Sequence, residues 1–224
     1  DKYMDKNKEL WNKVYTNAYN RPRYPNEHLV AFAMKNLPRG GGILDLCCGS
    51  GRHLKFLAEN GFKAYGCDVS EEGVFHAKEM LKEYHLQGEV LVASMEKIPF
   101  ESDFFDGLFS IGSLMYGTKE QIQSNAKEIY RVLKKGAKAY LNLRSVLDYR
   151  HINGKIISKY EVIVDEKDSS RPAYGENGMR VYHFDEEEVR RIYADFSHLT
   201  CDSIRHSFEN NAYANDNLIV VLTK

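Results

Sequence analysis

The feature of this sequence that most constrains its fold is a repeated alternation between short apolar runs and helical patterns. Strand-length apolar runs occur at residues 43–46, 63–67, 89–93, 105–111 and 137–143, and helical patterns separate most of them. Such alternation is typical of a parallel α/β sheet, because each helix returns the chain to the edge from which the next parallel strand starts. The sequence therefore predicts a doubly wound, Rossmann-like sheet.

The last part of the sequence departs from this alternation. Two further strand patterns cover residues 199–206 and 218–223, and the polar stretch between them is too short for a crossover helix. Strands joined by so short a connection pair antiparallel. We therefore expect a single domain over residues 1–224, with a helical cap at 1–37 and a sheet of seven strands. The sheet should be mostly parallel, with a terminal antiparallel strand.

Residues 145–183 also interrupt the alternation. Strand patterns at 155–165 and 179–182 flank a segment rich in turn-forming residues, 169–178, which predicts a small inserted β-hairpin. This segment follows the fifth strand, at the edge of a doubly wound sheet where ligands bind. We therefore expect the insertion to form a lid over a substrate.

Local signals predict where two of the helices begin and end. Thr118 and Gln121 form a capping-box pattern at the start of one helix, and Gly136 is expected to close it. Asp185 is expected to cap a later helix, with Glu188 as its return partner.

Composition excludes several classes of function. The 31 Lys and Arg residues balance 32 Asp and Glu residues, for a net charge of −1, which argues against a nucleic-acid binder that depends on bulk positive charge. The four cysteines are too few for a disulfide framework and lack zinc spacing, so we expect reduced thiols, no metal and a cytoplasmic protein. No apolar run is long enough to span a membrane, and the polar first residues do not resemble a signal peptide.

The stretch with most chemical information is Ile43–His53, which reads Ile-Leu-Asp-Leu-Cys-Cys-Gly-Ser-Gly-Arg-His. A buried strand holds Asp45, a turn carries Gly49 and Gly51, and a helix then begins. Glycine permits positive φ and lets a ligand approach the backbone, while the helix start offers free N–H groups. The next strand ends at Asp68, where doubly wound folds place the acceptor for ribose hydroxyls. This pattern predicts a nucleoside site.

Two residues distinguish a dinucleotide site from a site for S-adenosylmethionine. The dinucleotide fingerprint G-x-G-x-x-G is incomplete, because Leu54 stands at its third glycine position. Asp45 would also place a negative charge beside a pyrophosphate. A carboxylate there suits a cationic ligand, and S-adenosylmethionine carries both an amino group and a sulfonium. Electrostatics therefore favour S-adenosylmethionine over a nicotinamide dinucleotide.

At this point the chain resembles the class I S-adenosylmethionine-dependent methyltransferases over nearly its whole length. The resemblance is carried by five motifs in order and at normal spacing, at residues 45–51, 65–70, 93–100, 104–111 and 131–137. Two positions depart from the family pattern: Cys47 replaces the first glycine, and Ser94 stands where an acidic residue commonly holds the adenine amino group. The resemblance implies the fold predicted above, S-adenosylmethionine as cofactor and S-adenosylhomocysteine as product.

The resemblance also implies which residues bind the cofactor. They lie in the glycine turn and at the strand ends that follow it: Asp45, Cys47, Gly49, Ser50, Gly51, Asp68, Val69, Ser94, Met95 and Ile111. Val69 and Ile111 are expected to sandwich the adenine. Tyr15 and Arg23 are added because, in related proteins, the segment before the first strand often folds over the cofactor. Both are expected at the amino-acid end of the cofactor.

Acceptor chemistry must come from the loops at the carboxyl edge of the sheet. The candidate catalytic residues there are Tyr116, Arg144 and His183. Methylation of a hydroxyl needs a general base, and His183, before the last helix, is the candidate for that role. Arg144 ends the fifth strand, where it could hold an anionic group of the substrate. The same three residues are also compatible with structural roles, such as a salt bridge or a hydrogen-bonded histidine.

The predicted function is therefore methyl transfer to a small polar molecule, with O-methylation of a sugar- or nucleotide-linked metabolite favoured. The inserted lid, the 15 tyrosines and the balanced charge support this choice. N-methylation or RNA methylation stays open, although the segment 110–113 after the fourth strand lacks an Asn-Pro-Pro-Tyr-like motif. A non-catalytic, cofactor-binding regulatory module is the other alternative. A monomer and a homodimer are both compatible with the sequence.

Overall fold

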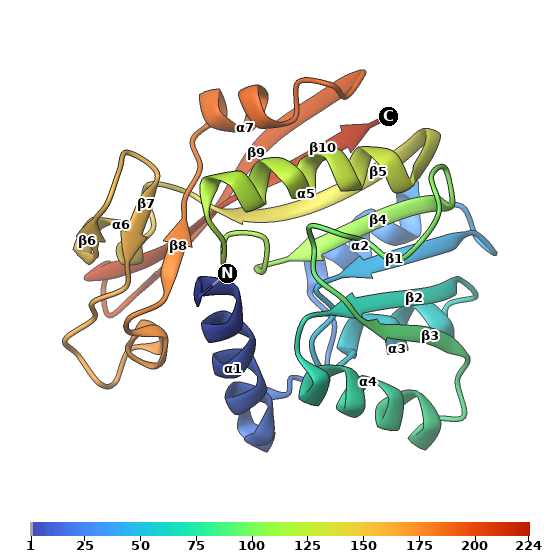
Figure 1. Ribbon diagram of the computed structural model, residues 1–224, viewed down its shortest axis with the longest axis horizontal. Helices are drawn as coiled ribbons and strands as arrows, with labels where there is room; N and C mark the ends of the chain where they lie inside the picture. The colour runs from blue at the N-terminus through green and yellow to red at the C-terminus, as the bar shows by residue number, and fades with distance from the viewer. Residues whose placement is uncertain (1) are drawn as a thin grey trace.

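The computed structural model describes residues 2–224, with side chains from Lys8 onward, and is built around one large sheet (Figure 1). Its strand order is β3-β2-β1-β4-β5-β10-β9. The strands are β1 (Gly42–Leu46), β2 (Lys63–Asp68), β3 (Gly88–Val92), β4 (Phe105–Ile111), β5 (Leu133–Arg144), β9 (His198–Phe208) and β10 (Tyr213–Thr223). The first five pair in parallel, and β10 pairs antiparallel with both β5 and β9. The predicted sheet is confirmed.

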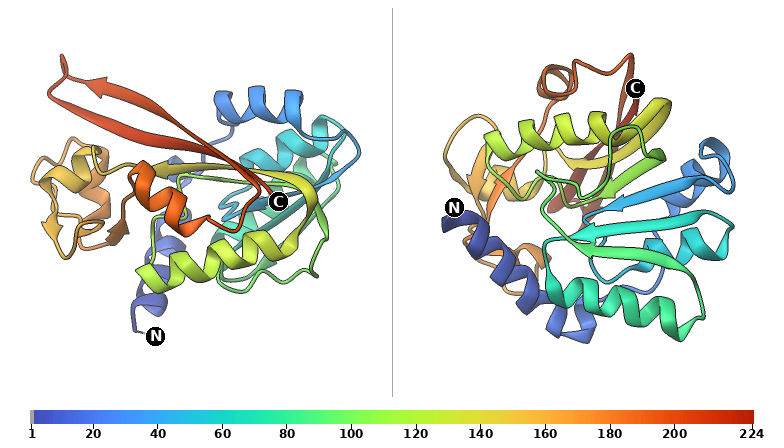
Figure 2. Two further views of the ribbon diagram at one scale, coloured as in Figure 1. Left: turned by 90° about the horizontal axis from the view of Figure 1, so that it is seen from above. Right: turned by 45° about the vertical axis from the view of Figure 1, so that its right-hand side comes forward.

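Helices cover both faces of this sheet, as the view from above shows (Figure 2). They are α2 (Glu27–Asn36), α3 (Arg52–Glu59), α4 (Glu71–Glu83), α5 (Lys119–Val132) and α7 (Glu186–Ile192). Neighbouring residues of β1 serve opposite faces, since side chains alternate along a strand. Ile43 packs in one core cluster with α2 and α3, and Leu44 packs in the other with α5. Asp45 shares the α3 side of the sheet with Ile43, which places it under the start of that helix.

The helix that carries the capping box ends earlier than predicted. Thr118 and Gln121 cap α5 as expected, but the helix stops at Val132 rather than just before Gly136. Leu133 already pairs with Phe105 of the neighbouring strand, and Gly136 lies inside β5 with a φ of 80°. A completely buried leucine that can pair in the sheet extends the strand instead of the helix.

The capping prediction for α7 is half correct. The side chain of Asp185 accepts a hydrogen bond from the Glu188 backbone N–H at 2.8 Å. Glu188 does not return this contact, because its carboxylate instead binds the Tyr182 hydroxyl and the guanidinium of Arg191, with 2.7 Å from Arg191 Nε.

The inserted segment 145–183 is a small antiparallel sheet rather than a simple hairpin. It contains α6 (Tyr149–Asn153), β6 (Lys155–Ile156), β7 (Glu161–Ile163), the short 3₁₀ helix η2 (Pro172–Glu176) and β8 (Arg180–Tyr182), with strand order β6-β7-β8. The prediction of one strand over 155–165 is wrong, because a turn closed by backbone hydrogen bonds between Ser158 and Glu161 splits it. The segment lies on the side toward which β4 and β5 run (Figure 1).

Helix α1 (Lys2–Thr16) stands beside the carboxyl ends of the central strands, between the inserted segment and α4 (Figure 1). Asn12 Oδ1 accepts a hydrogen bond from Ser70 Oγ at 2.7 Å, and Lys8 pairs with Glu71 at 2.6 Å. Both contacts hold α1 against the start of α4. Across the described residues, no helix is long and apolar enough to cross a membrane.

Candidate functional site

Two adjoining cavities lie over the carboxyl ends of β1, β2 and β4. Trp11, Tyr15, Cys47 and Ser113 line both of them. The first cavity is completed by Asp68, Val69, Ser94, Met95, Glu96, Tyr116 and Gln121. The second includes Asp45, Gly49, Ser50, Arg52, His53 and Ile111. Strands far apart in sequence thus deliver most of the expected cofactor residues to one place.

Four of the expected cofactor residues differ in their positions relative to the two cavities. Gly51 lies outside both cavities that the described residues form; it caps α3 with a φ of 90°, and a Cβ there would lie 2.8 Å from the Cβ of Ala77. Its role is therefore close packing of α3 against α4. Arg23 lines a different hollow beside His76, on the outer side of α4. Val69 lines the first cavity and Ile111 the second.

Asp45 carries an unpartnered oxygen into the second cavity. The residue is 1% exposed, and its Oδ2 has no hydrogen-bond partner among the described residues. Burial raises the pKa of Asp45 well above its ordinary value, and the nearby Arg52 offsets this only in part. A buried carboxylate oxygen without a donor is costly, so this position suits a ligand that brings a cation or an N–H group.

His53 lies beside Asp45 and lines the same cavity. Its Nδ1 is 3.7 Å from Asp45 Oδ2, and its Nε2 accepts a hydrogen bond from the Asn26 backbone N–H at 3.2 Å. Burial, and then the charge of Arg52, lowers the pKa of His53 to about 3. The ring is therefore neutral and does not neutralise Asp45.

Asp68 ties the glycine turn to the end of β2. Its Oδ2 accepts a hydrogen bond from the Gly49 N–H at 2.9 Å, and its Oδ1 accepts one from the Ser70 N–H at 2.8 Å. Burial raises the pKa of Asp68, and these backbone donors offset part of that rise. The carboxylate borders the first cavity, where the remaining lone pairs face any ligand.

The turn itself holds a side chain where the methyltransferase motif has glycine. Cys47 has a φ of 63°, in the left-handed region, which costs an L residue roughly 1–2 kcal/mol. Gly49 follows with a φ of 51°. Cys47 therefore keeps the shape that its family position requires, at the cost of local strain.

Two aromatic side chains of α1 form a wall that both cavities share. Trp11 stacks on Tyr15 with ring centroids 5.9 Å apart, and it meets Tyr116 edge-on at 5.0 Å. Burial, followed by the charge of Asp68, raises the pKa of Tyr15, so its hydroxyl stays protonated. Tyr15 is at the site as expected. Trp11 was missed as a site residue, although its spacing of four residues from Tyr15 places both on one helix face.

Glu96 is a second residue of the site that was not predicted from the sequence. Ser94 stands where an acidic residue was expected, and the carboxylate appears two residues later. Glu96 Oε2 accepts hydrogen bonds from Gln121 Nε2 at 3.1 Å and from Ser94 Oγ at 3.4 Å. This polar group closes the first cavity at the end away from Asp45.

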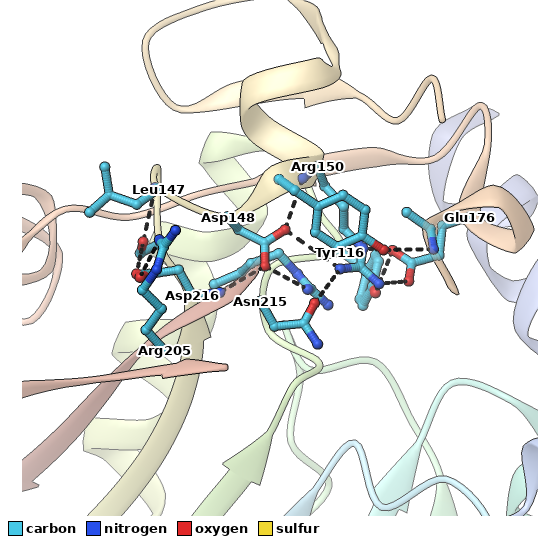
Figure 3. Close-up of polar contacts among 12 residues, drawn as sticks. Tyr116, Leu147, Asp148, Arg150, Glu176, Arg205, Asn215 and Asp216 are labelled. Carbon is cyan, nitrogen blue, oxygen red and sulfur yellow. Dashed lines mark hydrogen bonds and ion pairs between the residues drawn. The ribbon is translucent and has the colours of Figure 1, made fainter. Parts of the chain in front are cut away.

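Tyr116 connects the first cavity to the inserted segment (Figure 3). Its hydroxyl donates to Glu176 Oε2 at 3.2 Å, and Arg150 holds the same carboxylate through Nε at 2.8 Å and Nη2 at 2.6 Å. Burial, and then the charge of Glu176, raises the pKa of Tyr116 to about 12. Arg144 lies beside this hydroxyl and pairs with Asp148 Oδ2 at 3.2 Å.

His183 does not reach the cavities that the described residues form. It is completely buried, its backbone N–H donates to the Tyr160 carbonyl at 2.6 Å, and its ring lies 4.9 Å from that of His151. Burial, and then His151 and Arg144, lowers the pKa of His183 well below the usual range. The ring is neutral, but no contact with the cavity supports its expected role as catalytic base.

A family model described as "Methyltransferase domain" matches residues 43–136, which include the glycine turn, Asp68 and Glu96. Residues 43–136 are therefore similar to the methyltransferase domain of the class I S-adenosylmethionine-dependent methyltransferases. In the described part of this chain, no cluster of three or more side chains could hold a metal ion, and all four cysteines are free thiols.

Comparisons with individual proteins agree with this family. The chain is 34% identical over 97 residues to an uncharacterized methyltransferase of Synechocystis, covering 43% of this chain and 44% of that one. It is 32% identical over 120 residues to the Arabidopsis tRNA (carboxymethyluridine(34)-5-O)-methyltransferase, covering 53% and 28%. The match thus spans less than half the length of these relatives. An S-adenosylmethionine-dependent methyltransferase from Methanosarcina mazei shares the fold, with a TM-score of 0.69, 20% identity and coverage of 90% and 98%.

The residues present fit S-adenosylmethionine, the cofactor of this family. The unpartnered oxygen of Asp45 matches the positive amino group, and Asp68 matches the ribose hydroxyls. Gly49 lets Tyr15 approach the turn, because a Cβ there would lie 2.5 Å from the Tyr15 hydroxyl oxygen.

Proposed function

We propose that this methyltransferase transfers the methyl group of S-adenosylmethionine to a small polar acceptor. The favoured reaction is O-methylation of a sugar- or nucleotide-linked metabolite. The observation that carries the proposal is the buried, unpartnered carboxylate oxygen of Asp45 beside the glycine turn. The positively charged amino-acid end of S-adenosylmethionine can bind this oxygen, whereas the negative charges of a pyrophosphate and of the carboxylate would repel each other.

In this proposal the chain binds and orients the reactants. Asp45 holds the amino group of the cofactor, Asp68 holds the ribose, and Ser94 and Glu96 face the adenine end. When bound, S-adenosylmethionine supplies an electrophilic methyl group on its sulfonium. Trp11 and Tyr15 cover the site and exclude water, so that alignment of the acceptor supplies most of the rate enhancement.

The acceptor side is assigned to the region around Tyr116. A hydroxyl acceptor can hydrogen-bond the Tyr116 phenol, which Glu176 and Arg150 fix in place. We also propose that residues 1–37 form a helical cap and that residues 145–183 form a lid over the acceptor. The proposal further includes a single domain, a monomeric or homodimeric protein and a cytoplasmic location. The Arabidopsis relative, named for 5-O-methylation of a carboxymethyluridine, supports an oxygen acceptor.

That relative is also named for tRNA, which makes RNA the second acceptor to test. The net charge of −1 favours a small molecule. Methylation of RNA would show a steep loss of binding with rising salt, because phosphate contacts release counterions.

Thermal unfolding with S-adenosylhomocysteine, and with NAD as control, tests the proposed function. A ligand at about 100 times its dissociation constant stabilises a protein by about 2.7 kcal/mol. This corresponds to a rise in Tm of about 5–10 °C for a chain of this size. A rise with S-adenosylhomocysteine alone supports the proposal. A rise with NAD alone, or no rise with either, contradicts it, and binding without turnover of any acceptor would indicate a regulatory module.

A further inference from the structure

Unpartnered buried donors gather where β5 passes into the inserted segment. Within the described residues, no hydrogen-bond partner is found for Arg144 Nε or for either ring nitrogen of His183. Arg144 is 9% exposed and His183 is completely buried. An unsatisfied buried donor costs roughly 1–3 kcal/mol, more when it is charged. Such groups therefore point to something that binds them, as Asp45 does on the other side of the site.

Arg144 and His183 are neighbours in space. Phe184 donates its backbone N–H to the Arg144 carbonyl at 2.9 Å, and a parallel bridge joins Ser145 to Phe184. The end of β5 and the residues after β8 thus run side by side. The charges of Arg144 and Arg150 also help to lower the pKa of the His183 ring.

The two arginines of this region differ in how fully their donors are used. Arg150 gives Nε and Nη2 to Glu176 and Nη1 to Asn215 at 3.0 Å (Figure 3). Arg144 makes one ion pair, at 3.2 Å, to an oxygen of Asp148, and it also hydrogen-bonds the Tyr116 hydroxyl, while its Nε has no partner among the described residues. That oxygen also accepts the Asp216 N–H at 3.1 Å, so Asp148 is shared. Arg144 is therefore the arginine with donors left for a ligand.

Tyr116 links the first cavity to Arg144, which does not itself line that cavity. Tyr116 lines the cavity, meets Trp11 edge-on, and has its hydroxyl beside the Arg144 guanidinium. The Arg144 side chain keeps 11% of its surface exposed. A group that enters the cavity beside Tyr116 can thus meet a positive charge whose Nε–H is unused.

We propose that Arg144, with His183 behind it, binds an oxyanion carried by the methyl acceptor, either a carboxylate or a phosphate. This inference rests on the proposed function and names its substrate class: an acidic molecule, with Asp45 binding the cationic cofactor and Arg144 the anionic acceptor. Arginine suits this role because its planar fork matches both groups.

The test uses simple acids that need no knowledge of the natural acceptor. In the presence of saturating S-adenosylhomocysteine, benzoate is compared with benzamide, and phenyl phosphate with benzyl alcohol. The aromatic ring is chosen because Trp11, Tyr15 and Tyr116 form the cavity wall. Binding is followed by Tm and by fluorescence of Trp11, the single tryptophan of the sequence. The two acids distinguish a carboxylate acceptor from a phosphate acceptor.

Three variants distinguish the effect of the Arg144 charge on acid binding from an effect on folding. Arg144→Gln should weaken acid binding by about tenfold to a hundredfold, the worth of a charge-assisted hydrogen bond. Arg144→Lys keeps the charge but not the Nε–H, and should weaken it by about tenfold. Arg190→Gln is the control, because Arg190 pairs only with Glu186 on the exposed face of α7 among the described contacts. It should bind the acids as the wild type does.

Each outcome has a clear meaning. An acid that binds while its neutral analogue does not, and that loses affinity in both Arg144 variants, supports the proposal. Equal binding of acid and neutral analogue, binding of neither acid, or unchanged acid affinity in Arg144→Lys overturns it. If S-adenosylhomocysteine itself produces no shift, the proposed function fails instead. The two failures are therefore distinguishable, and Arg144→Lys covers the case in which Arg144→Gln does not fold.

Discussion

The hydroxyl of Tyr15 occupies the space in which a side chain on Gly49 would begin. A Cβ built on Gly49 would lie 2.5 Å from Tyr15 Oη and 3.0 Å from its Cζ. The glycine turn and the N-terminal helix are thus fitted to each other, although they lie more than thirty residues apart in the sequence. This fit explains why the turn needs glycine at position 49 for space as well as for its φ of 51°.

Gly49→Ala should therefore lose more stability and more cofactor affinity than backbone strain alone would remove. The positive φ costs roughly 1–2 kcal/mol, and the clash must also displace Tyr15 from the cavity wall. We expect a lower Tm and at least a tenfold loss of affinity for S-adenosylhomocysteine, measured by calorimetry. Gly61→Ala is the matched control, with a φ of 81° and no described atom within 4 Å of the added Cβ. Equal losses of affinity in the two variants would contradict this account of Tyr15.

Asp45→Asn should change stability and cofactor affinity in opposite directions. The amide removes an ionisable group that is buried without a donor, so the free protein should be at least as stable as the wild type. Cofactor binding should weaken by about tenfold to a hundredfold, because a charge-assisted hydrogen bond to the amino group is lost. The Tm of the free protein and the dissociation constant of S-adenosylhomocysteine measure the two effects. A less stable variant with unchanged affinity would give Asp45 a structural role only.

The succession of strands and helices along the chain could be predicted from the sequence, because hydrophobic runs, helix caps and connection lengths are local properties. The Thr118 capping box and the antiparallel pair β9 and β10 are where the pattern placed them. The glycine turn and Asp68 were also accessible, since consecutive parallel strands bring their carboxyl ends together.

Contacts between distant segments could not be predicted in this way. Glu176 reaches Tyr116 from a 3₁₀ helix 60 residues further along, and no periodicity announces that meeting. Arg23 was expected at the cofactor but lines a separate hollow beside His76 of α4. The expected single strand over 155–165 is instead two strands, β6 and β7, which pair with each other across the Ser158–Glu161 turn, and β7 also pairs with the distant β8.

The free protein should lose stability as the pH rises above the ordinary carboxyl range. Burial raises the folded-state pKa of both Asp45 and Asp68 above their unfolded values. A group with a raised folded pKa favours the fold below its unfolded pKa, and this contribution is lost as the pH rises through the folded pKa. Urea unfolding from about pH 4 to pH 7 measures the slope. Asp45→Asn should flatten it, and an unchanged slope would show that Asp45 titrates normally.

The link between Glu176 and Arg150 should dominate the stability of the inserted segment. Arg150 is only 5% exposed, and Glu176 holds it through two hydrogen bonds in the network around Tyr116 (Figure 3). Removal of one partner from a buried pair costs up to roughly 3–5 kcal/mol, and here Asp148 Oδ1, 3.5 Å from Arg150 Nη1, compensates only part of the remaining charge. Glu176→Ala should therefore unfold at a markedly lower urea concentration than the wild type.

The exposed pair of Glu186 and Arg190 provides the control for that variant. Its side chains are 61% and 54% exposed, so solvent screens the charges, and Glu186→Ala should cost less than about 1 kcal/mol. Fluorescence of Trp11 gives a second readout, because its ring contacts Tyr116. It should change in Glu176→Ala, where Tyr116 loses its acceptor, and stay unchanged in Glu186→Ala. Similar urea midpoints for the two variants would mean that water already reaches Arg150, and that the inserted segment is held by its apolar contacts instead.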